Sequence, residues 1–348
     1  MFISSATFSA ISRTSILQSQ SDLADLQKEL GSGTYADLGT ELGSRSGRLL
    51  GLSHEKERLA AYTFSGSVAT TRLSATDTVL TSLQSAANGF LQSLTTASSS
   101  GATKGGLQTA AAGALGTLIS SLNASVDGQS VFGGLNTGKA PLAAYTPASA
   151  AKQAIDQAFQ DRFGTSADQP AAASISASAM TDFLGNQFAA LFDPNSFKGT
   201  WSSATDAVQS TEVAPGETVT SSVSANADPF RAMAQTFAMV AEYTGPGTTL
   251  SASAQQAVVA AAMKTVSSAL SSLTDVQAGV GVAQGTVTAA GTRVAAQSDV
   301  LTGEVSTLHD TDPAALSVRL SALQTQLQAS YEVTSALKKL SLTNYFSA

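Results

Sequence analysis

Residues 259–308 read VAAAMKTVSSALSSLTDVQAGVGVAQGTVTAAGTRVAAQSDVLTGEVSTL, and an aliphatic side chain returns at every seventh position. That row consists of Val259, Val266, Leu273, Val280, Val287, Val294, Leu301 and Leu308. The interleaved row is apolar at its ends and polar or small in its middle, so the two rows form an a/d heptad seam. No proline interrupts residues 247–312. The pattern therefore predicts one helix of about 58 residues, or about 87 Å at 1.5 Å per residue.

A second seam precedes it in the chain. Apolar and small residues recur at alternating spacings of three and four from Leu59 to Leu94, and again from Leu107 to Leu122. Glycines at 101, 105 and 106 separate the two runs. This arrangement predicts an antiparallel helical hairpin on which the long helix packs. Small residues at Gly66, Ala69, Ala87 and Gly291 favour close approach of the helices.

The middle of the chain has a different composition and residue pattern. Prolines concentrate in residues 141–229, and Trp201–Thr205 is a candidate strand. Residues 207–224 alternate loosely around Ala-Pro-Gly-Glu, which predicts a β-hairpin. Asp228 followed by Pro229 is a helix start, with Asp228 expected as the N-cap. These features predict a small inserted domain.

Both ends of the chain carry amphipathic helices. Asp312 is expected to cap the carboxy-terminal helix, with Pro313 at its first position. A single helix pair cannot cover both of its apolar stripes, so we expect neighbouring copies to complete the burial. The expected assembly interface consists of Ile11, Ile16, Leu23, Leu26, Leu30, Leu320, Leu323, Leu327, Tyr331, Leu337 and Leu340.

The expected fold is mainly α: a long antiparallel helical rod, coiled-coil-like and formed by both chain ends, with a small inserted α+β or β domain. Its predicted parts are an amino-terminal assembly helix (1–40), the helical hairpin (41–140), the inserted outer domain (141–229), the long rod helix (230–311) and the carboxy-terminal assembly helix (312–348).

The composition argues against several classes of protein. Only 12% of the residues are charged and the net charge is −7, so a nucleic-acid binder is not expected. The chain has no cysteine, which excludes disulfides and zinc–cysteine sites. The sequence contains no run of 18 apolar residues, so no membrane-spanning helix is predicted. Its first residues do not resemble a secretory signal peptide.

No catalytic, cofactor or metal site is expected. Gly133–Lys139 fits G-x-x-x-x-G-K, but Ala140 and Pro141 follow where a P-loop needs Ser or Thr and then a helix. His54 and His309 have no partner at ligand spacing. One alternative is a glycan-binding module in which Trp201 and Phe197 form an aromatic platform, although a place in the domain core is the more common fate of such residues.

Local motifs resemble the flagellin family. Residues 21–33, SDLADLQKELGSG, are similar to the family's amino-terminal helix and its Ser-Gly turn, and Leu320–Leu342 is similar to its carboxy-terminal helix. Residues 131–142, VFGGLNTGKAPL, are similar to the hook-associated junction version of the family. The Asp-Asp cluster expected after the Ser-Gly turn is replaced by ADLGTELG at residues 36–43.

The resemblance implies a non-enzymatic, secreted flagellar subunit that joins hook to filament. It implies export through the flagellar type III apparatus, an export chaperone, and a ring or tube of copies in contact with other hook-associated proteins and flagellin. It also implies terminal helices that stay disordered until assembly. A flagellin of the filament itself is the alternative within the family.

Overall fold

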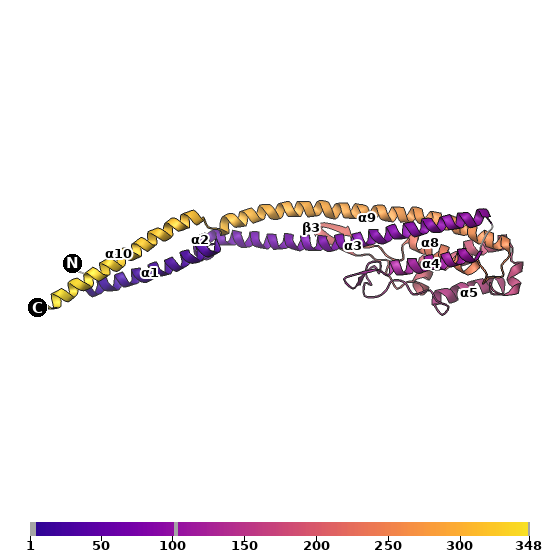
Figure 1. Ribbon diagram of the computed structural model, residues 1–348, viewed down its shortest axis with the longest axis horizontal. Helices are drawn as coiled ribbons and strands as arrows, with labels where there is room; N and C mark the ends of the chain where they lie inside the picture. Colours follow the sequence, from indigo (N-terminus) through magenta and orange to yellow (C-terminus); the bar gives the residue numbers. More distant parts are fainter. Residues whose placement is uncertain (1–4, 101–103, 347–348) are drawn as a thin grey trace. The chain divides into compact units, whose positions relative to one another are not determined.

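The computed structural model describes residues 5–100 and 104–346, and the secondary structure of this part is mainly helical, as predicted. Contacts divide the chain into two compact units. Unit 1 combines the two chain ends, residues 1–60 and 295–348, and unit 2 contains residues 61–294 (Figure 1). Two long helices, α3 (Ser46–Ser100) and α9 (Ala252–His309), contribute residues to both units.

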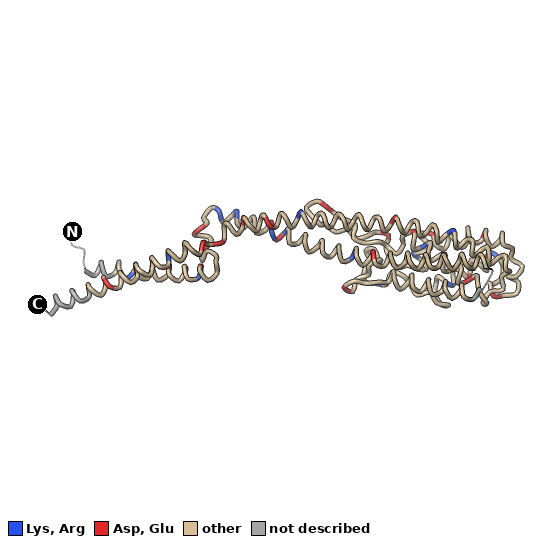
Figure 2. Tube along the Cα trace, turned by 45° about the horizontal axis from the view of Figure 1, so that its top comes forward, with Lys and Arg blue, Asp and Glu red and all other residues tan. Residues whose placement is uncertain are grey.

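Unit 1 is built on a helix pair, α1 (Ser5–Ser32) and α10 (Pro313–Phe346), which lie side by side (Figures 1 and 2). The short helix α2 (Leu38–Leu42) and a 3-10 turn (Gly43–Arg45) lead from α1 into α3. Asp312 caps α10 as predicted, because its Oδ1 accepts a hydrogen bond from the Ala314 amide at 2.8 Å. A bridge between Thr34 and Asp310 joins the chain after α1 to the chain before α10.

Unit 2 contains most of α9, whose full length is 58 residues and confirms the helix predicted from the heptads. Within this unit α3 and α9 run antiparallel: Gly66 lies beside Val287, and Thr81 lies beside Gln277. Helix α4 (Lys104–Leu122) packs on α8 (Asp228–Tyr243). The rings of Phe90 on α3 and Phe237 on α8 meet edge to face at 5.1 Å, which ties α8 to the long helices.

The inserted segment is richer in helix than predicted. It contains α5 (Ala150–Phe163), a 3-10 turn (Pro170–Ser174), α6 (Ala177–Phe183), a π-helical turn (Leu184–Phe188) and α7 (Pro194–Thr200). The predicted hairpin is confirmed as β3 (Ser210–Ala214) and β4 (Glu217–Thr220), with Gly216 at a φ of +73° in its turn. A smaller hairpin, β1 (Ser125–Val126) and β2 (Gln129–Ser130), follows α4.

Two local predictions are wrong. The strand expected at Trp201–Thr205 is absent, because Pro194 starts α7 and Trp201 ends it as the C-cap. Within Trp201–Thr205 only Ser202 forms a β-bridge, and its partner is Leu142. The N-cap of α8 is Ala227 and not Asp228, which lies inside the first turn. A proline restricts the backbone near a helix start but leaves the capping position uncertain by a residue.

Within the described residues, one helix, α9, contains an 18-residue window long and apolar enough by composition to cross a membrane. Its heptad row from Val259 to Val294 is buried inside the protein.

Candidate assembly surface

The α1–α10 pair is closed by a narrow seam. Leu26 on α1 and Leu316 and Leu327 on α10 are buried, with Leu26 only 8% exposed. The predicted residues Ile16, Leu23, Leu320 and Leu323 are half-buried along the same seam. These side chains serve contacts within one copy, and they are therefore less available to a neighbour than the sequence pattern alone suggested.

Small polar residues continue the seam where the apolar ones stop. The hydroxyls of Ser12 and Thr334 are hydrogen-bonded at 3.1 Å. At the exposed edge of the seam Gln20 Nε2 donates to the Tyr331 hydroxyl at 2.7 Å, while about half of the Tyr331 side chain stays exposed. The positions are consistent with antiparallel helices, because residues early in α1 meet residues late in α10. A pattern of apolar residues alone cannot reveal these polar seam positions.

Other apolar side chains of the pair point outward. Three predicted interface residues belong to this group: Ile11 is 61% exposed, Leu30 42% and Tyr331 48%. Further members that the sequence analysis missed are Leu17, Val318 and Val333. The side chains of Leu337 and Leu340 lie outside the described part of the structure. We call Ile11, Leu17, Leu30, Val318, Tyr331 and Val333 the outward set.

Polar contacts fix the chain where α1 turns back toward α2. The amide of Thr311 donates to the Gly33 carbonyl at 2.9 Å, and Glu29, although buried, accepts from the Ala36 amide at 3.0 Å. Hydrogen bonds from Thr40 lower the pKa of Asp37, and hydrogen bonds from Ser306 and His309 lower the pKa of Asp310. These bonds favour the ionised carboxylates at neutral pH. The segment that departs from the family's Asp-Asp pattern is thus an ordered turn.

A recess of about 310 Å³ lies along this pair, and three carboxylates line it from α1: Asp22, Asp25 and Glu29. Arg319 and Leu323 line it from α10. The excess of negative charge is the main electrostatic feature of the seam. Within the described residues no group of His, Cys, Asp and Glu is arranged to hold a metal ion.

In unit 2, the P-loop-like segment is a tight turn docked on the inserted segment. A side chain on Gly134 would place its Cβ 2.4 Å from the Thr205 carbonyl oxygen, and the φ of Gly134 is +65°. A Cβ on Gly133 would lie 2.4 Å from the Asn136 carbonyl oxygen. The Leu135 amide donates to Thr205 Oγ1 at 2.7 Å. The glycines are therefore required by close backbone packing and do not form a phosphate cradle.

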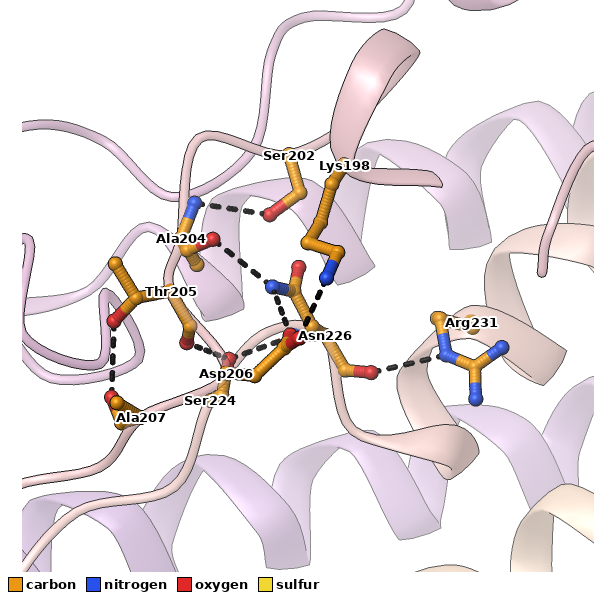
Figure 3. A network of polar contacts seen from close by, with 9 residues as sticks. All are labelled: Lys198, Ser202, Ala204, Thr205, Asp206, Ala207, Ser224, Asn226 and Arg231. Carbon is orange, nitrogen blue, oxygen red and sulfur yellow. Dashed lines mark hydrogen bonds and ion pairs between the residues drawn. The ribbon is translucent and has the colours of Figure 1, made fainter. Parts of the chain in front are cut away.

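A polar network holds the loop at residues 202–207, on which this turn docks (Figure 3). Asn226 Nδ2 donates to the Ala204 carbonyl at 2.9 Å and to Asp206 Oδ1 at 2.8 Å. Lys198 lies 2.6 Å from Asp206, and the bonds from Lys198 and Asn226 lower the pKa of that carboxyl. Arg231 Nε donates to the Asn226 carbonyl at 3.0 Å. All the residues of this network hold the loop in place, so the network is structural.

Trp201 belongs to the core of the inserted segment. It is 2% exposed and stacks on Tyr145 at 5.1 Å and on Phe197 at 5.9 Å. A buried indole that stacks on two neighbouring rings cannot receive a sugar ring. The aromatic platform considered for glycan binding is therefore wrong, and a place in the core is confirmed.

An open recess of about 780 Å³ lies between α4, α8 and the chain at Ala144–Tyr145. At its edge the Tyr145 hydroxyl donates to Glu242 at 2.6 Å, and Lys152 lies 3.2 Å from Glu242. Burial and the neighbouring Glu242 raise the pKa of Tyr145. Burial lowers the pKa of Lys152, but its bonds to Asp156 and Glu242 outweigh burial and raise it overall. Each charged group here has a partner, which fits a half-buried ion pair better than a reactive site.

Comparison with known protein families decides the class of protein. The family described as the bacterial flagellin N-terminal helical region matches residues 3–137, and the bacterial flagellin C-terminal helical region matches residues 263–346. The chain belongs to the flagellin family. It is accordingly a structural subunit of the bacterial flagellum. The first matched region contains α1, α3 and α4, and the second contains most of α9 and all of α10.

Among solved structures, one described as a flagellar hook-associated protein from Vibrio parahaemolyticus is similar to this flagellin-family chain. The TM-score is 0.52 at 14% sequence identity, and the match covers 77% of this chain and 99% of that chain. At this identity the likeness concerns the fold. No curated protein sequence matches the chain.

Proposed function

We propose that this flagellin-family subunit joins hook to filament, and that copies assemble into a ring or tube through the outward set on α1 and α10. The observation that carries the proposal is the division of apolar side chains in the helix pair. One row of side chains closes the pair, whereas the outward set, which includes Ile11 and Val333, stays largely exposed in the single chain. Exposed apolar side chains gathered on two long helices are typical of an interaction surface.

Two further features support the junction role over that of the filament subunit. The turn at Val131–Leu142 resembles the hook-associated version of the family, and the similar solved structure is described as hook-associated. We propose residues 1–40 and 312–348 as the assembly helices and 141–229 as the outer domain. Hook-associated proteins and flagellin are the proposed neighbours, and an export chaperone would cover the outward set before assembly.

Deletion of the gene tests the junction role. We expect hooks without filaments, and flagellin released into the medium, when this subunit is lost. Electron microscopy of the deletion strain and immunoblotting of the medium measure both effects. Filaments that remain attached to hooks would contradict the junction role, whereas loss of filaments without release of another flagellin would identify this chain as the filament subunit.

A further inference from the structure

A charge-free stretch runs along both long helices of unit 2 at the same level. Residues 59–71 of α3 and residues 276–292 of α9 contain no Asp, Glu, Lys or Arg. The contact between Gly66 and Val287 brings these two stretches together, and α3 and α9 lie side by side here in both views (Figures 1 and 2). Such a surface lacks the charges that normally keep proteins apart in solution.

The outer face of α3 in this stretch carries two large apolar side chains one turn apart. Phe64 is 70% exposed and Val68 is 49% exposed. Gly66 faces α9. Phe64 and Val68 lie two residues before and after it, and at 100° per residue they point almost directly away from α9. Phe64 and Val68 therefore form a projecting ridge on the side of α3 remote from its partner helix.

The outer face of α9 at this level carries small residues. Val280 and Val287 face inward and are buried, whereas Gly285 and Ala289 are exposed on the other side of the helix. The adjacent Val282 is 71% exposed and borders this row of small residues. Small residues let another helix approach closely, and we call the exposed, uncharged face at Gly285 and Ala289 the groove.

Ridge and groove lie at the same level and on opposite sides of the helix pair. Gly66 is level with Val287, so in an antiparallel pair Phe64 is level with Ala289 and Val68 with Gly285. The β3–β4 hairpin contacts the pair through Ser65, whose Oγ donates to the Glu212 carbonyl at 2.7 Å, and through an ion pair between Glu217 and Arg293. These contacts leave the ridge and the groove uncovered.

We infer that the Phe64–Val68 ridge of one copy packs into the Gly285–Ala289 groove of a second copy. The contact is heterologous, because each copy offers a ridge on one side and a groove on the other, and such contacts propagate instead of closing as a dimer. A lipid surface is a poorer occupant, since binding helices of that kind carry basic residues beside the apolar face. The inference rests on the proposed self-assembly and names its contact in unit 2.

Cysteine cross-linking of the full chain tests the contact directly, because the chain has no cysteine of its own. In the double variant Val68→Cys/Gly285→Cys the two thiols of one copy lie on opposite sides of the helix pair and cannot meet, whereas a ridge seated in a groove brings thiols of two copies within disulfide range. We expect a ladder of dimers, trimers and larger species on non-reducing gels under mild oxidation. The control variant Val68→Cys/Ser267→Cys moves one thiol about 27 Å along α9 and should give no ladder.

A second measurement uses no cysteine. Phe64→Ser should raise the concentration at which the chain associates by at least about tenfold, as judged by sedimentation velocity, since one buried phenyl ring is lost from the contact. Leu135→Ser, at a side chain 59% exposed elsewhere in unit 2, is the matched control and should not change association.

Cross-linking no stronger than in the control pair, or unchanged association of Phe64→Ser, would overturn the inference. Its failure is distinguishable from failure of the junction role. A deletion strain that has hooks without filaments and releases flagellin into the medium, combined with no ladder, would retain the junction role and remove this contact. A ladder combined with filaments that stay attached would retain the contact and remove the junction role.

Discussion

The helices of unit 1 and unit 2 differ in how many neighbours they have. Helix α8 has 16 residues, and ten of them are buried, including Phe230, Met233, Phe237 and Val240. Helix α1 is 28 residues long, yet among its described side chains only Ser19, Leu26 and Glu29 are buried. A helix in a simple pair can bury one narrow face, whereas a helix enclosed by others can bury most of its surface. Length alone therefore does not indicate how stable a helix is.

The difference has a functional meaning. Unit 2 can complete an apolar core from its own side chains, and its inserted segment adds the ring cluster around Phe159, Phe183, Phe188 and Tyr243. Unit 1 leaves the outward set exposed. A subunit with one self-sufficient part and one part that gains stability on association can remain separate until it reaches its site of assembly.

Amide hydrogen exchange should reveal the largest contrast. In the dilute chain we expect amides of α8 to exchange at least about a thousandfold more slowly than those of α1 and α10, because helices with few buried contacts open at low cost. Mass spectrometry of peptides from these helices measures the rates. Association at high concentration should slow exchange in α1 and α10 but leave α8 unchanged.

Equal protection of α1, α10 and α8 in the dilute chain would contradict this contrast. It would mean that the helix pair is stable without neighbours, and the argument from the outward set would lose its main support.

Phe237→Ala should destabilise unit 2 by about 3–5 kcal/mol, because the ring is buried and packs edge to face on Phe90. Urea unfolding followed by tryptophan fluorescence measures this unit specifically, since Trp201 is the only tryptophan. Phe64→Ala, at an exposed ring, is the control and should change the free energy of unfolding by less than about 0.5 kcal/mol. Similar losses in both variants would show that burial does not distinguish these positions.

Gly134→Ala should lower the free energy of unfolding of unit 2 by about 2–4 kcal/mol. The positive φ is unfavourable for alanine, and its methyl group would meet the Thr205 carbonyl oxygen. The same fluorescence-detected unfolding measures the effect. Gly138→Ala is the control, because the added methyl group would meet no atom within 4 Å and the φ of Gly138 is not positive; a comparable loss there would refute the packing argument.

The sequence was sufficient to predict the elements with strong periodicity. The heptads of α9 required a single long helix, and Ala-Pro-Gly-Glu placed the β3–β4 turn. The inserted helices were harder, because their apolar residues, among them Phe159, Phe183 and Phe188, are used in mutual ring packing and not in a regular stripe. Trp201 could be assigned to the core only when its stacked neighbours were known.

The sequence separated the seam residues of the helix pair from the exposed ones only in part, and the reason lies in the seam. Counting apolar positions selects Ile11 and Tyr331 as members of the same stripe as Leu23 and Leu327. The structure continues the seam through Ser12 and Thr334, one hydrogen-bonded hydroxyl pair, so the larger neighbours turn outward. Small hydroxyl residues carry no hydrophobic signal, and only the pairing of the helices shows which of two adjacent residues lies inside.

Leu323→Asp should loosen the α1–α10 pair by about 2 kcal/mol, since it places a fourth carboxylate beside Asp22, Asp25 and Glu29. We expect faster amide exchange in α1 and α10, loss of assembly, and an unchanged unfolding midpoint for unit 2. Val333→Ser is the matched variant on the outward set: it should weaken assembly yet leave exchange in the isolated pair unchanged. If both variants loosen the pair equally, the division between seam and outward set is wrong.

The smallest effect per residue should appear in alkali, and it belongs to unit 2. Burial, together with the nearby Glu242, raises the pKa of Tyr145 and of Tyr243 above the ordinary value of about 10. Their neutral phenols therefore contribute fully to stability below pH 10, and the contribution is lost as the pH rises toward the folded-state pKa. At pH 11 we expect unit 2 to lose about 1 kcal/mol for each of the two tyrosines.

Unfolding in urea at pH 9, 10 and 11, followed by Trp201 fluorescence, measures this dependence. Tyr145→Phe is the informative variant, because phenylalanine cannot ionise and the slope of stability against pH should fall by the share of one tyrosine. Loss of the hydrogen bond to Glu242 lowers the free energy of unfolding equally at each pH, so it does not change the slope that is compared. A slope unchanged by Tyr145→Phe would show that this phenol ionises as readily in the folded unit as in the unfolded chain, and the packing of Tyr145 between Trp201 and Glu242 would then not exclude water.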